Sequence, residues 1–176
     1  MALSEDLIRL DAHTLADAEA HVAGEDHEMR LRFEAPDPDI PATLDHFRDV
    51  LRKWIAAHAA GAPTIVYAVR RLSGELIGGA EIRRPTPTCV DVSYWIYPAY
   101  RGRGYATRAL VLLCRIAAST PGVGQVEAHI DPDNLASRRT AEAAGFLELG
   151  LVEERWRSGA VGARVRYARL MAPNAD

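Results

Sequence analysis

Hydrophobic residues recur along the chain with two periods, and each period predicts a different kind of element. Between Leu44 and Ile55 the apolar residues stand three and four positions apart, which predicts a helix from a Thr43 cap to about Ala59. Short stretches rich in β-branched and aromatic residues predict strands instead. Three such stretches follow the helix and predict a hairpin meander: residues 64–70, 75–83 and 89–97.

Beyond this meander the pattern alternates between helix and strand. Helices are predicted from Gly104 to about Ser119 and from an Asn134 cap to Ala144, with Gly145 ending the second helix. The remaining predicted strands are residues 125–130 and a closing antiparallel pair, 146–156 and 163–171. Near the N-terminus the pattern predicts a strand at residues 7–10, a helix at 14–23 and a proline-containing loop at 25–41.

These elements predict an α/β (α+β) protein with a mostly antiparallel N-terminal half and a βαβ-like C-terminal half. The chain has 176 residues, of which 48% are hydrophobic and 26% charged, and it contains no repeat or linker. We therefore expect one globular domain over residues 1–176.

Charge, hydrophobicity and cysteine content argue against several classes of function and location. The net charge of -3 gives no support for a nucleic-acid-binding face. Residues 1–10 are mixed polar and acidic, unlike a signal peptide, and no apolar stretch is long enough for a membrane span, so we expect a cytoplasmic protein without membrane partners. Cys89 and Cys114 lack metal-ligand spacing, and no metal is expected.

The segment from Arg101 to Thr107 has the features of an anion-binding turn. A strand, Pro98 and a glycine-containing turn lead into a helix whose first backbone N–H groups lack partners within the helix. Gly102 and Gly104 allow close backbone approach, and Arg101 and Arg103 supply positive charge. A glycine turn that merely caps a helix is the alternative. The segment lacks both the Gly-Lys-Ser/Thr ending of a Walker loop and the third glycine of a Rossmann fingerprint.

A second group of residues follows the strand at 125–130. Asn134 opens the next helix, and Ser137 lies one turn further on the same face. Taken alone, Asn134 is compatible with a plain helix cap and Ser137 with a solvated first-turn residue.

Together these motifs resemble the GNAT N-acetyltransferase superfamily, and most closely its branch of Rim-type ribosomal-protein alanine acetyltransferases. The motifs are Tyr94-Trp95-Ile96-x-Pro98, Arg101-Gly102-Arg103-Gly104-Tyr105-Ala106-Thr107, Asn134-x-x-Ser137 and Ala144-Gly145-Phe146. The resemblance implies a mixed, mostly antiparallel sheet of about seven strands flanked by about four helices. It also implies a single N-acetyltransferase domain that uses acetyl-CoA, and it is compatible with a homodimer.

The resemblance further assigns roles in binding acetyl-CoA. Backbone groups near Ile96 would pair with the pantetheine arm, and the side chain of Asn134 would reach it. Ser137 would lie near the CoA sulfur. The residues that would hold the pyrophosphate are Arg101, Gly102, Arg103, Gly104, Tyr105, Ala106 and Thr107.

The implied reaction is direct attack of a neutral amine on the thioester, which needs a base, oxyanion donors and an acid. Three residues are candidate bases: Asp91, if the strand contains a bulge, Glu81 and His129. Exposed strand carboxylates and a structural histidine are the alternatives. Glu153 and Glu154 could meet a substrate ammonium. Some relatives carry a tyrosine that acts as the general acid at the position of Ala141. Its absence here leaves Ser137 as the candidate acid.

The acceptor is left open by the sequence. The acidic segment from Gly24 to Asp39 either borders the acceptor pocket and favours a cationic amine, or is a solvated loop. A small-molecule amine and a protein N-terminus both fit the resemblance. A non-catalytic module that senses acyl-CoA is a further alternative, because no base is fixed by the motifs.

Overall fold

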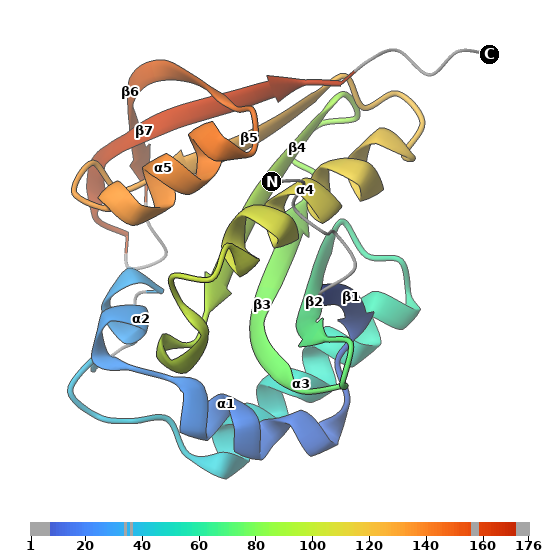
Figure 1. Ribbon diagram of the computed structural model, residues 1–176, viewed down its shortest axis with the longest axis vertical. Coiled ribbons are helices and arrows are strands. Elements are labelled where there is room, and N and C mark those ends of the chain that lie inside the picture. Colours follow the sequence, from blue (N-terminus) through green and yellow to red (C-terminus); the bar gives the residue numbers. More distant parts are fainter. Residues whose placement is uncertain (1–7, 34, 36, 156–158, 172–176) are drawn as a thin grey trace.

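The computed structural model describes residues 8–33, 35, 37–155 and 159–171. Its centre is one seven-stranded sheet in the order β1-β2-β3-β4-β5-β7-β6 (Figure 1). Every neighbouring pair is antiparallel except β4 and β5, which run parallel. The strands are β1 Ile8–Ala12, β2 Thr64–Arg71, β3 Leu76–Arg83, β4 Cys89–Ile96, β5 Gln125–Ile130, β6 Leu147–Arg155 and β7 Val161–Leu170.

Helices cover both faces of the sheet. α4 and α5 contact each other and pack on one face, whereas α1 and α3 contact each other at the other face, where Trp54 of α3 lies 6.1 Å from Trp95 of β4 (Figure 1). The helices are α1 Ala18–Gly24, α2 His27–Arg32, α3 Leu44–Ala59, α4 Tyr105–Ala118 and α5 Leu135–Ala143, with short 3-10 turns at Leu15–Asp17 and Pro98–Tyr100. None of the described helices is long and apolar enough to cross a membrane.

The main core lies between α4 and the sheet. Leu110 and Leu113 of α4 are completely buried against Val90 of β4 and Val126 of β5. These α4 positions stand three apart, so they occupy one stripe of the helix, and alternate residues of each strand face them. Burying a side chain of this size contributes about 1.5–3 kcal/mol, so this layer fixes the parallel β4-α4-β5 unit.

The predicted fold class is confirmed, because the sheet is mixed and mostly antiparallel and β4-α4-β5 forms the expected βαβ unit. One prediction was wrong. The segment 25–41, expected to be a loop, contains α2, whose first turn is capped by Asp26 accepting a hydrogen bond of 2.8 Å from the Met29 N–H. Met29 is buried against the sheet, and its packing stabilises α2. The helix is too short for its hydrophobic residues to show a helical period in the sequence.

Beneath the end of β4, a buried polar cluster joins the N-terminal helices to the sheet. The His21 ring lies 2.7 Å from the Tyr97 hydroxyl and 3.5 Å from His13. Asp17 pairs with Arg70 at 2.7 Å. Burial, followed by repulsion from His13, lowers the pKa of His21 to about 3. Burial alone would raise the pKa of Asp17, but hydrogen bonds from His13 and Arg70 outweigh it and lower that pKa.

The shift at His21 predicts a pH dependence of stability. The unfolded chain takes up a proton on His21 near pH 6.5, whereas the folded chain does not until about pH 3. The free energy of unfolding should therefore fall as the pH drops below 6.5, with a slope approaching about 1.4 kcal/mol per pH unit. Asp17 adds to the loss only below about pH 4, where its unfolded form is protonated.

Urea unfolding between pH 7 and pH 4.5 measures this slope. His21→Asn should reduce it, while the exposed control His46→Gln should keep it. An unchanged slope in His21→Asn would assign the pH dependence to another group.

A second prediction concerns Gly78 in β3, where the strand passes closely over β4. A Cβ on Gly78 would overlap the carbonyl oxygen of Trp95, and backbone cannot move aside as a side chain can. Gly78→Ala should therefore lower the free energy of unfolding by roughly 1–3 kcal/mol, the usual cost of overpacking. Gly124→Ala is the matched control, because its Cβ would meet no atom within 4 Å and its φ is not positive. Equal thermal unfolding of both variants would contradict this prediction.

Candidate active site

Strands β4 and β5 pair over only part of their lengths. Their register joins Cys89, Val90 and Asp91 to residues 125–127, yet β4 continues to Ile96 and β5 to Ile130. Beyond Asp91, the edge of β4 that faces β5 and the edge of β5 that faces β4 are not paired with each other. The Tyr97 N–H bonds to the Ile77 carbonyl of β3, and alternate residues of an antiparallel strand face opposite edges. The backbone groups of Tyr94 and Ile96 therefore point toward the opening.

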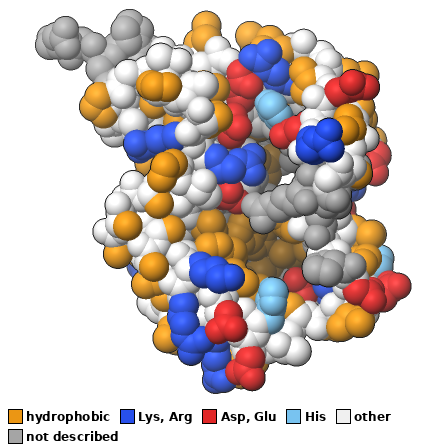
Figure 2. All heavy atoms as spheres, turned by 180° about the vertical axis from the view of Figure 1, so that it is seen from behind, with side chains coloured by type: hydrophobic (Ala, Val, Ile, Leu, Met, Phe, Trp, Pro, Cys, Tyr) orange, Lys and Arg blue, Asp and Glu red, His pale blue; other side chains and the backbone are white. Residues whose placement is uncertain are grey.

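A cavity of about 720 Å³ occupies this opening, within the range typical of small-molecule sites. Figure 2 shows the back of the molecule hollowed, with hydrophobic side chains at the floor and charged side chains of both signs around it. The cavity is lined by α2, the inner edges of β4 and β5, the turn before α4, and the start of α5. Of the predicted site residues, those that line it are Glu81, Ile96, Arg101, Gly102, Gly104, Tyr105, Ala106, Thr107, His129, Asn134 and Ser137.

The turn before α4 presents unpaired backbone donors to the cavity. Gly102 and Gly104 have φ of 74° and 76°, a conformation that costs little only for glycine. Gly104 forms the N-cap without a capping side chain, and the first bond within the helix runs from the Arg108 N–H to its carbonyl. The N–H groups of residues 105–107 therefore have no partner within α4. Together with the helix dipole they form a site suited to an anion.

Arg101 holds this turn in place in addition to lining the cavity. Its Nε donates to the Ile96 carbonyl at 3.0 Å, and its Nη1 lies 2.9 Å from Asp26 and 3.2 Å from Glu28. The guanidinium therefore links the turn to the end of β4 and to α2. The same contacts neutralise part of the acidic segment from Gly24 to Asp39. Arg103 is exposed and is not among the described residues that line the cavity.

At the start of α5, Ser137 is held by two other side chains. The Asn134 Oδ1 accepts from the Ser137 N–H at 3.1 Å, so the predicted cap exists. The Tyr94 hydroxyl lies 2.9 Å from Ser137 Oγ and 3.1 Å from its carbonyl oxygen. Burial raises the pKa of Tyr94 to about 12 and keeps the phenol neutral. The sequence marks Tyr94 only as part of a motif, because its partner lies 43 residues away.

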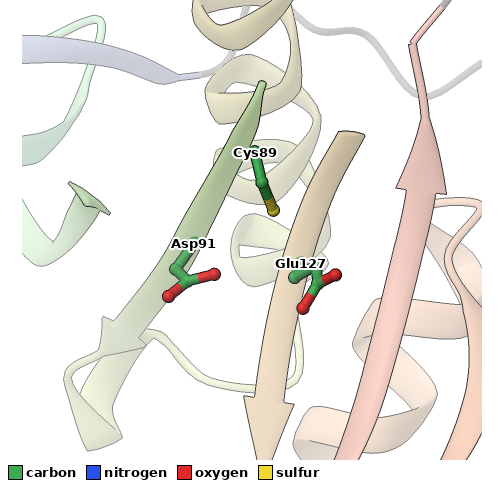
Figure 3. Close-up of side chains that lie close together, drawn as sticks. All are labelled: Cys89, Asp91 and Glu127. Atoms are coloured by element: carbon green, nitrogen blue, oxygen red, sulfur yellow. The ribbon is translucent and has the colours of Figure 1, made fainter. Parts of the chain in front are cut away.

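Where β4 and β5 part, Cys89, Asp91 and Glu127 lie close together (Figure 3). Burial raises the pKa of Asp91, whereas hydrogen bonds from Arg166 lower that of Glu127. Burial and then Glu127 raise the pKa of Cys89 to about 11, which disfavours a thiolate nucleophile. Glu127 of this group also accepts a hydrogen bond of 2.9 Å from Arg166.

Asp91 and His129 are both predicted bases, but they occupy different environments. Asp91 is not among the described residues that line the cavity. The pairing of β3 with β4 runs without a bulge from the pair Gly78–Ile96 to the pair Arg83–Asp91. The bulge assumed for Asp91 is therefore wrong. His129 lines the cavity, with Nδ1 at 3.2 Å from Glu154 and Nε2 at 3.2 Å from Glu127.

Glu81 also lines the cavity but is buried, with 7% of its surface exposed. Its carboxylate accepts a long hydrogen bond of 3.5 Å from Ser93 and lies 3.6 Å from Arg83.

α2 forms the outer wall of the cavity. Arg32 at its end pairs with Asp131 at 2.9 Å and with Asp133 at 3.2 Å, just beyond β5. Phe33 meets Trp95 edge to face, with ring centroids 5.2 Å apart. α2 thus bridges the opening between β4 and β5 and adds an apolar wall to the side opposite α5.

The sequence matches the model of the acetyltransferase (GNAT) domain over residues 8–147, which is most of the chain. This chain belongs to the GNAT acetyltransferase family. It is therefore an acyltransferase, as the motifs predict.

Two proteins of Bacillus subtilis (strain 168) are similar in sequence. The uncharacterized N-acetyltransferase YjdG is 26% identical over 144 residues, covering 81% of this chain and 82% of the relative. The uncharacterized N-acetyltransferase YycN is 33% identical over 73 residues, which are 42% of this chain. That match spans 46% of YycN.

Solved structures confirm the fold at lower identity. The microcin C7 self-immunity acetyltransferase MccE, solved with acetyl-CoA and AMP, has a TM-score of 0.77 at 14% identity, covering 94% of this chain and 93% of its own. RimL, a ribosomal L7/L12 α-N-protein acetyltransferase solved with CoA, has a TM-score of 0.73 at 19% identity and covers 94% of each chain. Rim-type enzymes are thus among the proteins that share this fold.

Proposed function

We propose that this GNAT protein transfers an acetyl group from acetyl-CoA directly to a primary amine. The observation that supports this most is the cavity where β4 and β5 separate, which joins the free N–H groups of the turn to Ser137 and His129. It offers an anion site, an unpaired strand edge and polar side chains on both faces of the sheet.

Acetyl-CoA fits this arrangement as the donor. Its pyrophosphate would bind the N–H groups of residues 105–107, and its pantetheine amides would bond to the free edge of β4. The Asn134 Oδ1 is occupied by the Ser137 N–H, which leaves the amide NH₂ group to donate to pantetheine. This route directs the thioester toward Ser137.

His129 and Glu154 form the proposed base. A neutral imidazole carries one N–H, so one ring nitrogen of His129 donates to its neighbouring carboxylate. The other nitrogen keeps a lone pair that faces the second carboxylate. Glu154 is 39% exposed at the cavity, where it can receive the proton of an incoming ammonium. Glu81 is buried and has only long contacts with Ser93 and Arg83, and Asp91 is not among the described lining residues, so both are weaker candidates.

The acceptor would approach from the side of α2. Phe33 and Trp95 form an apolar wall there, and Glu154 offers a negative charge. We therefore propose a primary ammonium carried next to an apolar group, a description that includes both small amines and peptide N-termini.

The direct experiment is release of the CoA thiol from acetyl-CoA in the presence of a panel of amines and N-terminal peptides. We expect release with an amine next to an apolar group and none with a dicarboxylate amine. Binding of acetyl-CoA without release for any acceptor would favour an acyl-CoA sensor. Failure to bind acetyl-CoA would contradict the proposed function.

The anion turn gives a prediction on donor affinity. Gly104→Val places a β-branched residue where φ is 76°, so the turn must change shape and lose N–H contacts with the pyrophosphate. Losing one bond to a charged group costs about 1.5–3 kcal/mol, or roughly tenfold to a hundredfold in Kd for acetyl-CoA. Gly61→Val is the matched control, since Gly61 has φ of 58° and no neighbour within 4 Å of its Cβ. Calorimetric titration should show weaker binding only for Gly104→Val.

The proposed base gives a prediction on turnover. His129→Gln and Glu154→Gln should each lower kcat by about a hundredfold and flatten the rise of rate with pH, because the base is lost. The double variant should be little worse than either single one, since the pair acts as a unit. Glu153→Gln, the adjacent exposed carboxylate of β6, should keep normal turnover. Normal pH profiles in both single variants would assign the base elsewhere.

A further inference from the structure

We infer that Tyr94 and Ser137 form a donor pair that receives the departing sulfur as a thiolate and does not protonate it. This inference rests on the proposed function and adds a positioning residue, Tyr94, to it. The first observation is geometric. The Tyr94 hydroxyl lies within hydrogen-bond distance of both Ser137 Oγ and the Ser137 carbonyl oxygen, and both residues line the cavity.

The proton count of these groups decides which way Ser137 can donate. A phenol carries one proton and a carbonyl oxygen only accepts. When Tyr94 donates to the carbonyl, Ser137 must donate to Tyr94 and has no proton left for a ligand. When Tyr94 donates to Ser137 Oγ, the serine proton turns toward the cavity. A negative sulfur in the cavity favours this second arrangement, since it completes a chain from Tyr94 through Ser137 to the sulfur.

Acid strength determines how far the proton moves along this chain. The pKa of Tyr94 is raised by burial to about 12, whereas an alkyl thiol titrates near about 8.5. Complete transfer from the phenol to the thiolate is therefore unfavourable by roughly 3.5 pKa units, about three thousandfold. A serine hydroxyl is a weaker acid still. The pair is thus a source of hydrogen bonds and not of a proton.

The surroundings of Tyr94 shift its pKa in both directions: burial raises it and outweighs the hydrogen bonds with Ser137 and Thr140, which lower it. Tyr167 of β7 lies beyond it, and its hydroxyl is bonded to Arg138, Glu142 and Glu148. Repulsion from Tyr167 also raises the pKa of Tyr94. Ser137 lies in the first turn of α5, where the positive end of the helix dipole favours an anion.

The bonds and charges of the transfer balance without an acid at the sulfur. The neutral amine forms the N–C bond and places a negative charge on the carbonyl oxygen. Collapse then re-forms the carbonyl and breaks the C–S bond, and the electron pair stays on sulfur. The His129–Glu154 pair first passes the proton that it took from the ammonium to water, and the surplus proton on nitrogen then follows the same route. CoA leaves the site as a thiolate and gains its proton in solution.

The test uses CoA binding without an acceptor. In the wild-type protein the affinity for CoA should rise with pH through the thiol titration, because bound CoA has a thiol pKa lowered by about one unit. Desulfo-CoA, which lacks the thiol, should show no such rise. Tyr94→Phe and Ser137→Ala should remove the difference between the two ligands. Ser137→Thr, which keeps a hydroxyl, should retain it, as should the control Tyr67→Phe, which changes a half-buried phenol of β2.

Turnover supplies a second readout. Tyr94→Phe and Ser137→Ala should each lower kcat about tenfold, the effect of one hydrogen bond, with little change in KM for acetyl-CoA. The double variant should match Ser137→Ala, because Tyr94 acts through Ser137.

The outcomes separate this inference from the proposed function. Equal pH dependence for CoA and desulfo-CoA in the wild type would overturn the thiolate site even if acetyl transfer occurs. Multiplicative losses in the double variant would overturn the role of Tyr94 as a positioning residue. Failure to bind CoA at any pH would overturn the proposed function, and this inference with it.

Discussion

The site depends on one feature of the sheet, the end of β4–β5 pairing after Asp91 and Glu127. Unpaired backbone polar groups inside a protein are costly, so a sheet that parts along its centre needs other partners for both edges. The strands are held together on one side of this point by the α4 core and are spanned on the other by α2. Arg101 bonds one exposed carbonyl, that of Ile96, and the rest of the edge remains for a ligand.

The anion turn is fixed by the same arrangement. β4 leads through the 3-10 turn Pro98–Tyr100 and the glycine turn into α4, so the free N–H groups of α4 lie at the mouth of the opening. Arg101 was expected mainly as a ligand for phosphate, but its contacts with Ile96, Asp26 and Glu28 also make it the link between the turn and α2. A change in α2 would therefore alter the donor site as well as the acceptor wall.

Local patterns predicted most of the fold, and the reasons for the exceptions are physical. α3 and α4 are long enough to show a period, and the glycine turn is a contiguous motif. α2 has one buried anchor, Met29, among prolines and charges, so no period reveals it. Contacts between distant segments were also hidden. Tyr94 meets Ser137 and His129 meets Glu154 only because the sheet order brings β4 to α5 and β5 to the last hairpin.

The alternation of side chains along β4 and β5 divides the proposed chemistry between two faces. Tyr94 faces α5, where Ser137 lies, whereas its neighbour Trp95 faces α3 and Phe33. On β5, Ala128 belongs to the α4 core, and His129 points to the opposite side. A thioester placed between the strands would therefore have its sulfur near hydroxyl donors on one face and meet the amine and base on the other. A shift of one residue in either strand would turn its side chains to the opposite face, so the strand register determines which groups meet the sulfur and which meet the amine.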